Sequence, residues 1–292
     1  MLKHIIKVTL VTLVIAGLIL PFLQLRAAEP EKASSGKDAG RILDELAALK
    51  ENSVLSPSER TRQEITIRKE ALSKIIELSN EELDALASKL AALDFPEKTQ
   101  WAAIRERLTA LIGTYADYQR ATGSALASES DLAGIKDLSR AYKAWREDYY
   151  IPATRMMLNF ILIAQEKAVL QTADSRLEKI ISDLKKLESA QLISNGDFQS
   201  SLDLSVTHLA DAGLYNKEAE RLFFAALAAN DFFATASVAG IRDTASSASS
   251  TAAKIQAGER IASLIEKSLT EIKSTYLGFL DISKLVKKKL GF

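Results

Sequence analysis

The chain has 292 residues, with 38 basic and 38 acidic side chains, two histidines and no cysteine. The even balance of charge gives no basis for a nucleic-acid partner, because binding to phosphates requires clustered positive charge. The lack of cysteine excludes a disulfide framework, a thiolate nucleophile and an iron–sulfur ligand set. The length suffices for one large or two small domains.

Residues 1–27 predict an export segment. Lys3 and Lys7 form a basic start, and the run Val8–Leu25 that follows carries no charge. A secretory apolar region needs roughly 7 to 15 residues and a membrane span about 20. The strongest apolar part, Val8–Leu20, fits a signal peptide, and the whole run only approaches a span. Two alternatives stay open, a cleaved signal peptide and a retained N-terminal membrane anchor. Under the positive-inside rule both leave the rest of the chain extracytoplasmic, either secreted or anchored to the cytoplasmic membrane.

The next segment, residues 28–40, mixes proline, serine, glycine and charged residues and predicts a flexible linker. Residues 41–292 contain few prolines and glycines and many alanines, leucines, lysines and glutamates. No window alternates apolar and polar residues between turn signals, so no sheet is expected. The pattern predicts an all-α fold, an elongated antiparallel helical bundle with long coiled-coil-like helices and a sub-boundary near residues 189–201.

Several short motifs predict where helices begin and end. A helix start is indicated by a serine or aspartate that is followed three residues later by glutamate. Glycine and asparagine mark turns and helix ends. Helix starts are expected at Ser56–Glu59, Ser79–Glu82 and Asp94–Glu97, a turn at Ser194–Asp197, and a helix end followed by a new cap at Gly213–Asn216.

Aromatic side chains gather just before a proline. Tyr142, Trp145 and Tyr149 fall on one helical face, and Pro152 is expected to end or kink the helix. The face is either a stacking platform that binds a glycan or peptide, or core packing with tyrosine hydroxyls at a polar rim. We prefer the core interpretation.

Two regular apolar stripes indicate long helices. The stripe in Pro152–Glu188 has heptad spacing, and a second stripe lies near the C-terminus. They comprise Ile163, Leu170, Ala173, Leu177, Ile180, Leu184 and Leu187, then Ile265, Leu269, Ile272, Tyr276, Phe279, Val286 and Leu290. The stripes either form a coiled-coil interface for a partner or bury one another within the bundle, and we prefer the second interpretation.

The same region carries a resemblance. AYKAWREDYYIP (Ala141–Pro152) and NFILIAQEKAVLQTADSRLEKIISDLKKLE (Asn159–Glu188) resemble uncharacterised exported helical proteins of small-genome candidate-phylum bacteria. The resemblance implies an exported bacterial protein and assigns no functional residue.

Few residues suggest catalysis. On a helix Ser205, His208 and Asp211 would share one face, but neither a nucleophile elbow nor a glycine-rich loop flanks Ser205. The acidic residues are scattered, and no P-loop or dinucleotide fingerprint occurs. We therefore expect neither an enzyme nor a cofactor or metal site.

The segment Leu222–Ile241 approaches the length of a membrane span, but Asn230 and Asp231 interrupt it. We read it as a buried hairpin or close-packed helix pair. A membrane-inserting effector, similar to helical pore-forming toxins, could instead use its phenylalanines. These are Phe223, Phe224, Phe232 and Phe233.

The sequence thus favours an exported or envelope-associated helical scaffold or interaction protein with an unidentified protein or envelope partner. Self-association and membrane contact through the N-terminal segment fit the same hypothesis. The membrane-inserting effector is the alternative.

Overall fold

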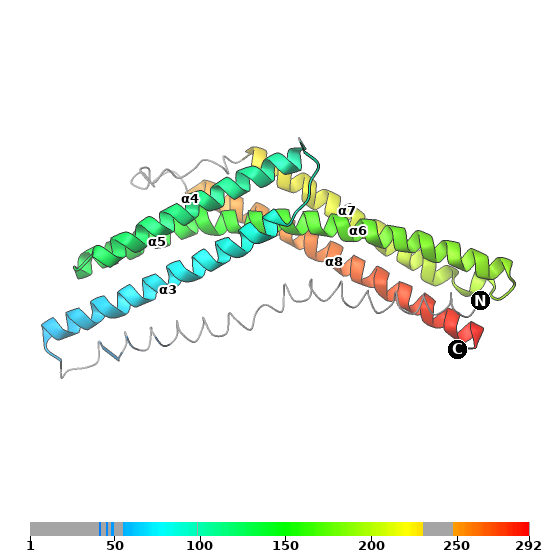
Figure 1. Ribbon diagram of the computed structural model, residues 1–292, viewed down its shortest axis with the longest axis horizontal. Coiled ribbons are helices and arrows are strands. Elements are labelled where there is room, and N and C mark those ends of the chain that lie inside the picture. The colour runs from blue at the N-terminus through cyan, green and yellow to red at the C-terminus, as the bar shows by residue number, and fades with distance from the viewer. Residues whose placement is uncertain are drawn as a thin grey trace. The chain divides into compact units, whose positions relative to one another are not determined.

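The computed structural model describes Arg41, Glu45, Ala48, Leu49 and residues 55–97, 99–229 and 248–291. The predicted export segment and linker lie outside these residues. Helices joined by short turns make up the described part, which contains no strand, so the all-α prediction is confirmed. The helices, shown in Figure 1, are α3 (Pro57–Ala91), α4 (Gln100–Ser128), α5 (Leu132–Trp145), the π-helical turn η1 (Arg146–Tyr150), α6 (Ile151–Ser189), the short 3-10 helix η2 (Asn195–Asp197), α7 (Gln199–Ala229) and α8 (Ala248–Leu290).

The chain divides into two compact units. The first comprises residues 1–75 and 126–136, and the second comprises residues 76–125 and 137–292. The division falls within α3, α4 and α5 rather than in the connection between α6 and α7.

In the first unit, α3 begins at the predicted capping box. The backbone N–H of Glu59 donates to Ser56 Oγ (3.3 Å), and the backbone N–H of Ser56 donates to Glu59 Oε2 (3.0 Å). These two bonds satisfy amide groups that a helix start would otherwise leave unpaired. Further along α3, the Glu64 carboxylate pairs with Arg68 of the same helix (2.7 Å) and with Lys136 of α5 (3.3 Å). The second ion pair connects α3 to α5 within this unit.

In the second unit, α6, α7 and α8 lie side by side (Figure 1) and pack against one another. The helix expected over Pro152–Glu188 is confirmed, since α6 spans Ile151–Ser189. At one end of the three helices, Leu184, Phe198 and Ile282 form a buried cluster, and Lys289 pairs with Asp197 (2.9 Å) beside it.

The two apolar stripes face the interior of this unit. Most of their members are buried or half-buried, and the Arg176 guanidinium of α6 lies over the Tyr276 ring of α8, 5.4 Å from its centre. Buried members are Ile163, Ala173, Leu177, Leu184, Ile265, Ile272, Tyr276 and Phe279. The stripes thus supply packing surface within the three helices.

Three predicted helix boundaries were wrong. Ser79–Glu82 lies inside α3, α4 begins at Gln100 instead of Asp94–Glu97, and Gly213–Asn216 lies inside α7. At α4 the backbone N–H of Ala102 donates to Thr99 Oγ1 (3.2 Å), so Thr99 caps the helix in place of the predicted aspartate. The predicted turn at Ser194–Asp197 is confirmed, with a capping box between those two residues.

The helix does not end at Pro152. The turn just before it widens to a π-helical turn, in which the backbone N–H of Ile151 donates to the Arg146 carbonyl. Proline has no N–H, and in an α-helix its ring collides with the carbonyl four residues earlier. A wider turn relieves that collision, so the chain passes from α5 into α6 without leaving helical geometry.

Candidate functional site

The predicted aromatic face lies mainly in the interior of the second unit. Tyr142 and Trp145 are buried, with Trp145 3% exposed, and Tyr149 is half-buried. The indole of Trp145 stacks on the Tyr118 ring with centroids 4.2 Å apart, and the Tyr115 ring meets it edge-on at 5.4 Å. As it stands, this face can pack against α4 but presents no open stacking surface at Trp145.

The π-helical turn changes which tyrosine completes this cluster. In an α-helix the residue four positions after Trp145 would share its face, and that residue is Tyr149. Because each turn of a π-helix holds an additional residue, Tyr150 takes that position. Tyr150 is buried, and its ring centroid lies 5.4 Å from that of Trp145.

The Tyr150 hydroxyl ties this cluster to α3. It lies 2.9 Å from the Ser79 carbonyl oxygen and 2.7 Å from Glu82 Oε2, both acceptors for its proton. The Arg146 guanidinium donates to Ser79 Oγ (3.1 Å). Burial, followed by the nearby Glu82 carboxylate, raises the pKa of Tyr150 well above its usual range, so the phenol stays protonated and serves as a donor.

The Ser205, His208 and Asp211 combination is not assembled as a triad. Ser205 is buried, and its hydroxyl donates to the Ser201 carbonyl (2.8 Å). His208 Nδ1 lies 2.6 Å from Glu271 Oε2 on α8. The histidine thus connects α7 to α8. The serine packs beside Gly278 of α8, where the two helices lie so close that a larger residue than glycine would overlap Ser205 Oγ.

A buried polar cluster in α6, α7 and α8 was not anticipated from the sequence. The Glu166 side chain is fully buried, and Asn216 Nδ2 donates to Glu166 Oε2 (2.8 Å) and to the Ile163 carbonyl (3.3 Å). Ser268 is also buried, and its hydroxyl donates to the Ala212 carbonyl (2.8 Å). The sequence signal for this cluster is a glutamate, Glu166, on the apolar side of α6. No sequence pattern predicts that Asn216 lies beside it.

The phenylalanines proposed to enter membranes divide into two pairs. Phe223 is fully buried and Phe224 is half-buried, within an aromatic cluster in which Phe160 lies 5.6 Å from Phe223 and Trp101 lies 5.4 Å from Phe224. Phe232 and Phe233, like Asn230 and Asp231, lie outside the described residues. None of the described helices is long and apolar enough to cross a membrane.

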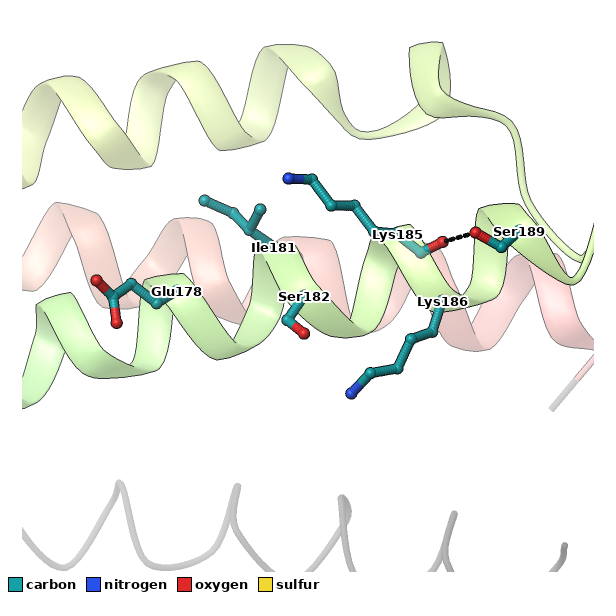
Figure 2. Close-up of a pocket in the computed structure, with 6 residues that line it drawn as sticks. All are labelled: Glu178, Ile181, Ser182, Lys185, Lys186 and Ser189. Carbon is teal, nitrogen blue, oxygen red and sulfur yellow. Dashed lines mark hydrogen bonds between the residues drawn. The ribbon is translucent and has the colours of Figure 1, made fainter.

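One open depression lies on the surface of α6. Figure 2 shows that its six labelled residues all project from this single helix, with the Ser189 hydroxyl donating to the Lys185 carbonyl (2.8 Å). Lys186 on the same surface pairs with Asp183 (2.9 Å). Ligand sites usually draw polar groups from several elements, so this depression is a weak candidate.

Within the described residues no three His, Asp or Glu side chains lie close enough together to hold a metal ion. Comparison with known proteins returned no matching family model, curated protein or solved structure.

Proposed function

We propose that this protein is an exported or envelope-associated helical scaffold that works by binding a partner protein. The apolar N-terminal run behind Lys3 and Lys7 supports export, and the resemblance of Ala141–Pro152 and Asn159–Glu188 to exported bacterial proteins agrees with it. In this proposal the long helices form an elongated antiparallel bundle whose outer surface carries the function.

The observation that carries the proposal is a set of large apolar side chains exposed on α7 and α8. Leu204 is 57% exposed, Leu214 63% and Leu277 51%, and Val206 is exposed as well. Single exposed apolar residues are common, but several on one pair of packed helices are typical of interaction surfaces. Val206 follows Leu204 by two residues and projects from the opposite side of α7, so we define Leu204, Leu214 and Leu277 alone as the leucine surface.

Two members of the leucine surface lie at the same level of the helix pair. Leu204 and Leu277 directly precede Ser205 and Gly278, where α7 and α8 approach so closely that a methyl group on Gly278 would overlap Ser205 Oγ. Leu214 directly precedes Tyr215, whose ring faces the ammonium group of Lys267 on α8 at 5.9 Å. The surface therefore follows the α7–α8 seam, a more accessible place than the buried rings of Tyr142 and Trp145.

The proposal is testable by photo-crosslinking in cells that express the full chain. A photoreactive amino acid replaces Leu204, Leu214 or Leu277, with replacements at exposed Lys185 and Lys217 as matched controls. We expect one defined adduct from the leucine positions and none from the controls. Equal labelling at all five positions would contradict the binding surface, and a cytoplasmic location of the adduct would contradict export.

The membrane-inserting alternative is measured separately. Purified protein is added to dye-loaded vesicles, and leakage is followed with and without Phe223→Ser. The scaffold proposal expects no leakage, whereas leakage that requires residues 222–241 would replace it with the effector hypothesis.

A further inference from the structure

The buried carboxyl group of Glu166 has an incomplete set of partners. Its side chain is 0% exposed, and Oε2 accepts a hydrogen bond from Asn216 Nδ2 (2.8 Å). Its second oxygen, Oε1, is buried and has no hydrogen-bond partner among the described residues. A charged carboxylate removed from water needs compensation at both oxygens, and here only one is compensated.

The surroundings of Glu166 are neutral. Asn216 on α7 and Ser268 on α8 are the polar side chains that act on it, and neither carries a charge. The ionisable residues within one turn of these two positions are at least partly exposed. They are Tyr215, Lys217, Glu218 and Glu220 on α7, and Glu266, Lys267 and Glu271 on α8.

Four of those ionisable groups are engaged with other partners. Glu220 pairs with Lys167 (3.6 Å), and Glu271 lies 2.6 Å from His208 Nδ1. Glu218 pairs with Arg221, and Lys267 faces the Tyr215 ring. None of them is among the groups that shift the pKa of Glu166, so within the described part of the chain no cation offsets a negative charge at this position.

We propose that Glu166 is a proton-responsive element, neutral when α6 packs against α7 and α8, whose ionisation loosens that packing. Its position makes the response specific to these three helices, because the carboxyl group contacts α7 through Asn216 and lies beside Ser268 of α8. The same helices carry the leucine surface, but the proton response does not depend on the proposed binding function.

The direction of the response follows from linkage. Burial raises the pKa of Glu166 from 4.5 to about 7, and the neighbouring Ser268 hydroxyl and the hydrogen bond from Asn216 oppose this rise. The packed state therefore holds its proton more tightly than the loosened state. The stabilisation is fully present below about pH 4.5 and is lost as the pH rises through about 7.

Hydrogen exchange of the full-length protein tests the proposal. Protection of α6, α7 and α8 amides is measured at pH 5 and pH 8, after correction for the intrinsic pH dependence of exchange. We expect protection in the wild type to fall by on the order of 100-fold between these values. Glu166→Gln should abolish this fall, and Glu220→Gln, which removes a half-exposed carboxylate from the same region, should preserve it.

Two outcomes would overturn the proposal. One is a wild-type protection that does not change with pH, and the other is an unchanged fall in Glu166→Gln. Should that variant fail to fold, carbon NMR titration of the Glu166 carboxyl in the wild type decides the matter. A midpoint near 7 supports the proposal, and a midpoint at or below 4.5 refutes it.

Discussion

Replacing Trp145 with alanine distinguishes core from binding platform at the aromatic face. The indole is 3% exposed and is surrounded by tyrosine rings, with centroids at 4.2 Å from Tyr118, 5.4 Å from Tyr115 and Tyr150, and 5.6 Å from Tyr142. Alanine would leave a void that these rings, held on three helical segments, fill only in part. Emptying a buried large aromatic site costs about 3 to 5 kcal/mol, so we expect a loss of that size in the free energy of unfolding.

Denaturation in guanidinium chloride, followed by far-UV circular dichroism, measures this loss. Tyr149→Ala is the matched control, since Tyr149 is a half-buried aromatic residue of the same short segment and should cost less. Trp145→Phe keeps an aromatic ring and should fall between wild type and alanine. An unchanged midpoint in Trp145→Ala, together with loss of a crosslinked partner, would refute the assignment of this face to the core.

Other substitutions test single contacts. Tyr150→Phe removes the hydroxyl that bonds to α3 and should cost about 0.5 to 1.5 kcal/mol in thermal or chemical unfolding. Gly278→Ala should lower the free energy of unfolding by about 1 to 3 kcal/mol, because the new methyl group overlaps Ser205 Oγ. Adding Ser205→Ala to this variant should restore most of the lost stability, because the nearest atoms are then the two Cβ atoms, 3.5 Å apart. An equal loss in the double variant would show that the overlap is not the cause. Ser56→Ala should cost about 1 kcal/mol and increase exchange at the start of α3, and no change there would show that the cap is dispensable.

Predictions from the sequence succeeded where the determining contacts are local. The Ser56–Glu59 box forms because its two partners are three residues apart and bond to each other's backbone. The long helix α6 follows from a regular apolar stripe that needs only some apolar neighbour, whichever helix supplies it. In both cases the signal and its physical cause lie in the same stretch of chain.

Predictions failed where a side chain that matches a local capping motif forms its hydrogen bonds with residues far away in the sequence. Ser79 and Glu82 match a capping box, yet in the fold they receive hydrogen bonds from Arg146 and Tyr150. Asn216 resembles a cap after Gly213, but its amide donates to Glu166, 50 positions earlier. A polar residue in a helix is ambiguous until its partner is known, and the partner is set by the packing of other helices.

The π-helical turn shows how one local constraint changes a tertiary surface. Pro152 predicts a break, and the chain satisfies the same steric demand by widening the preceding turn by one residue. That single residue exchanges Tyr149 for Tyr150 on the face that contains Trp145. The exchange places the Tyr150 hydroxyl where it reaches Ser79 and Glu82, which are the residues that a capping-box reading had assigned to a helix start. The tyrosine exchange and the bonds from Tyr150 to Ser79 and Glu82 therefore follow from one turn of the helix. A variant such as Pro152→Ala, which removes the steric demand, should allow the turn to tighten and return Tyr149 toward the core.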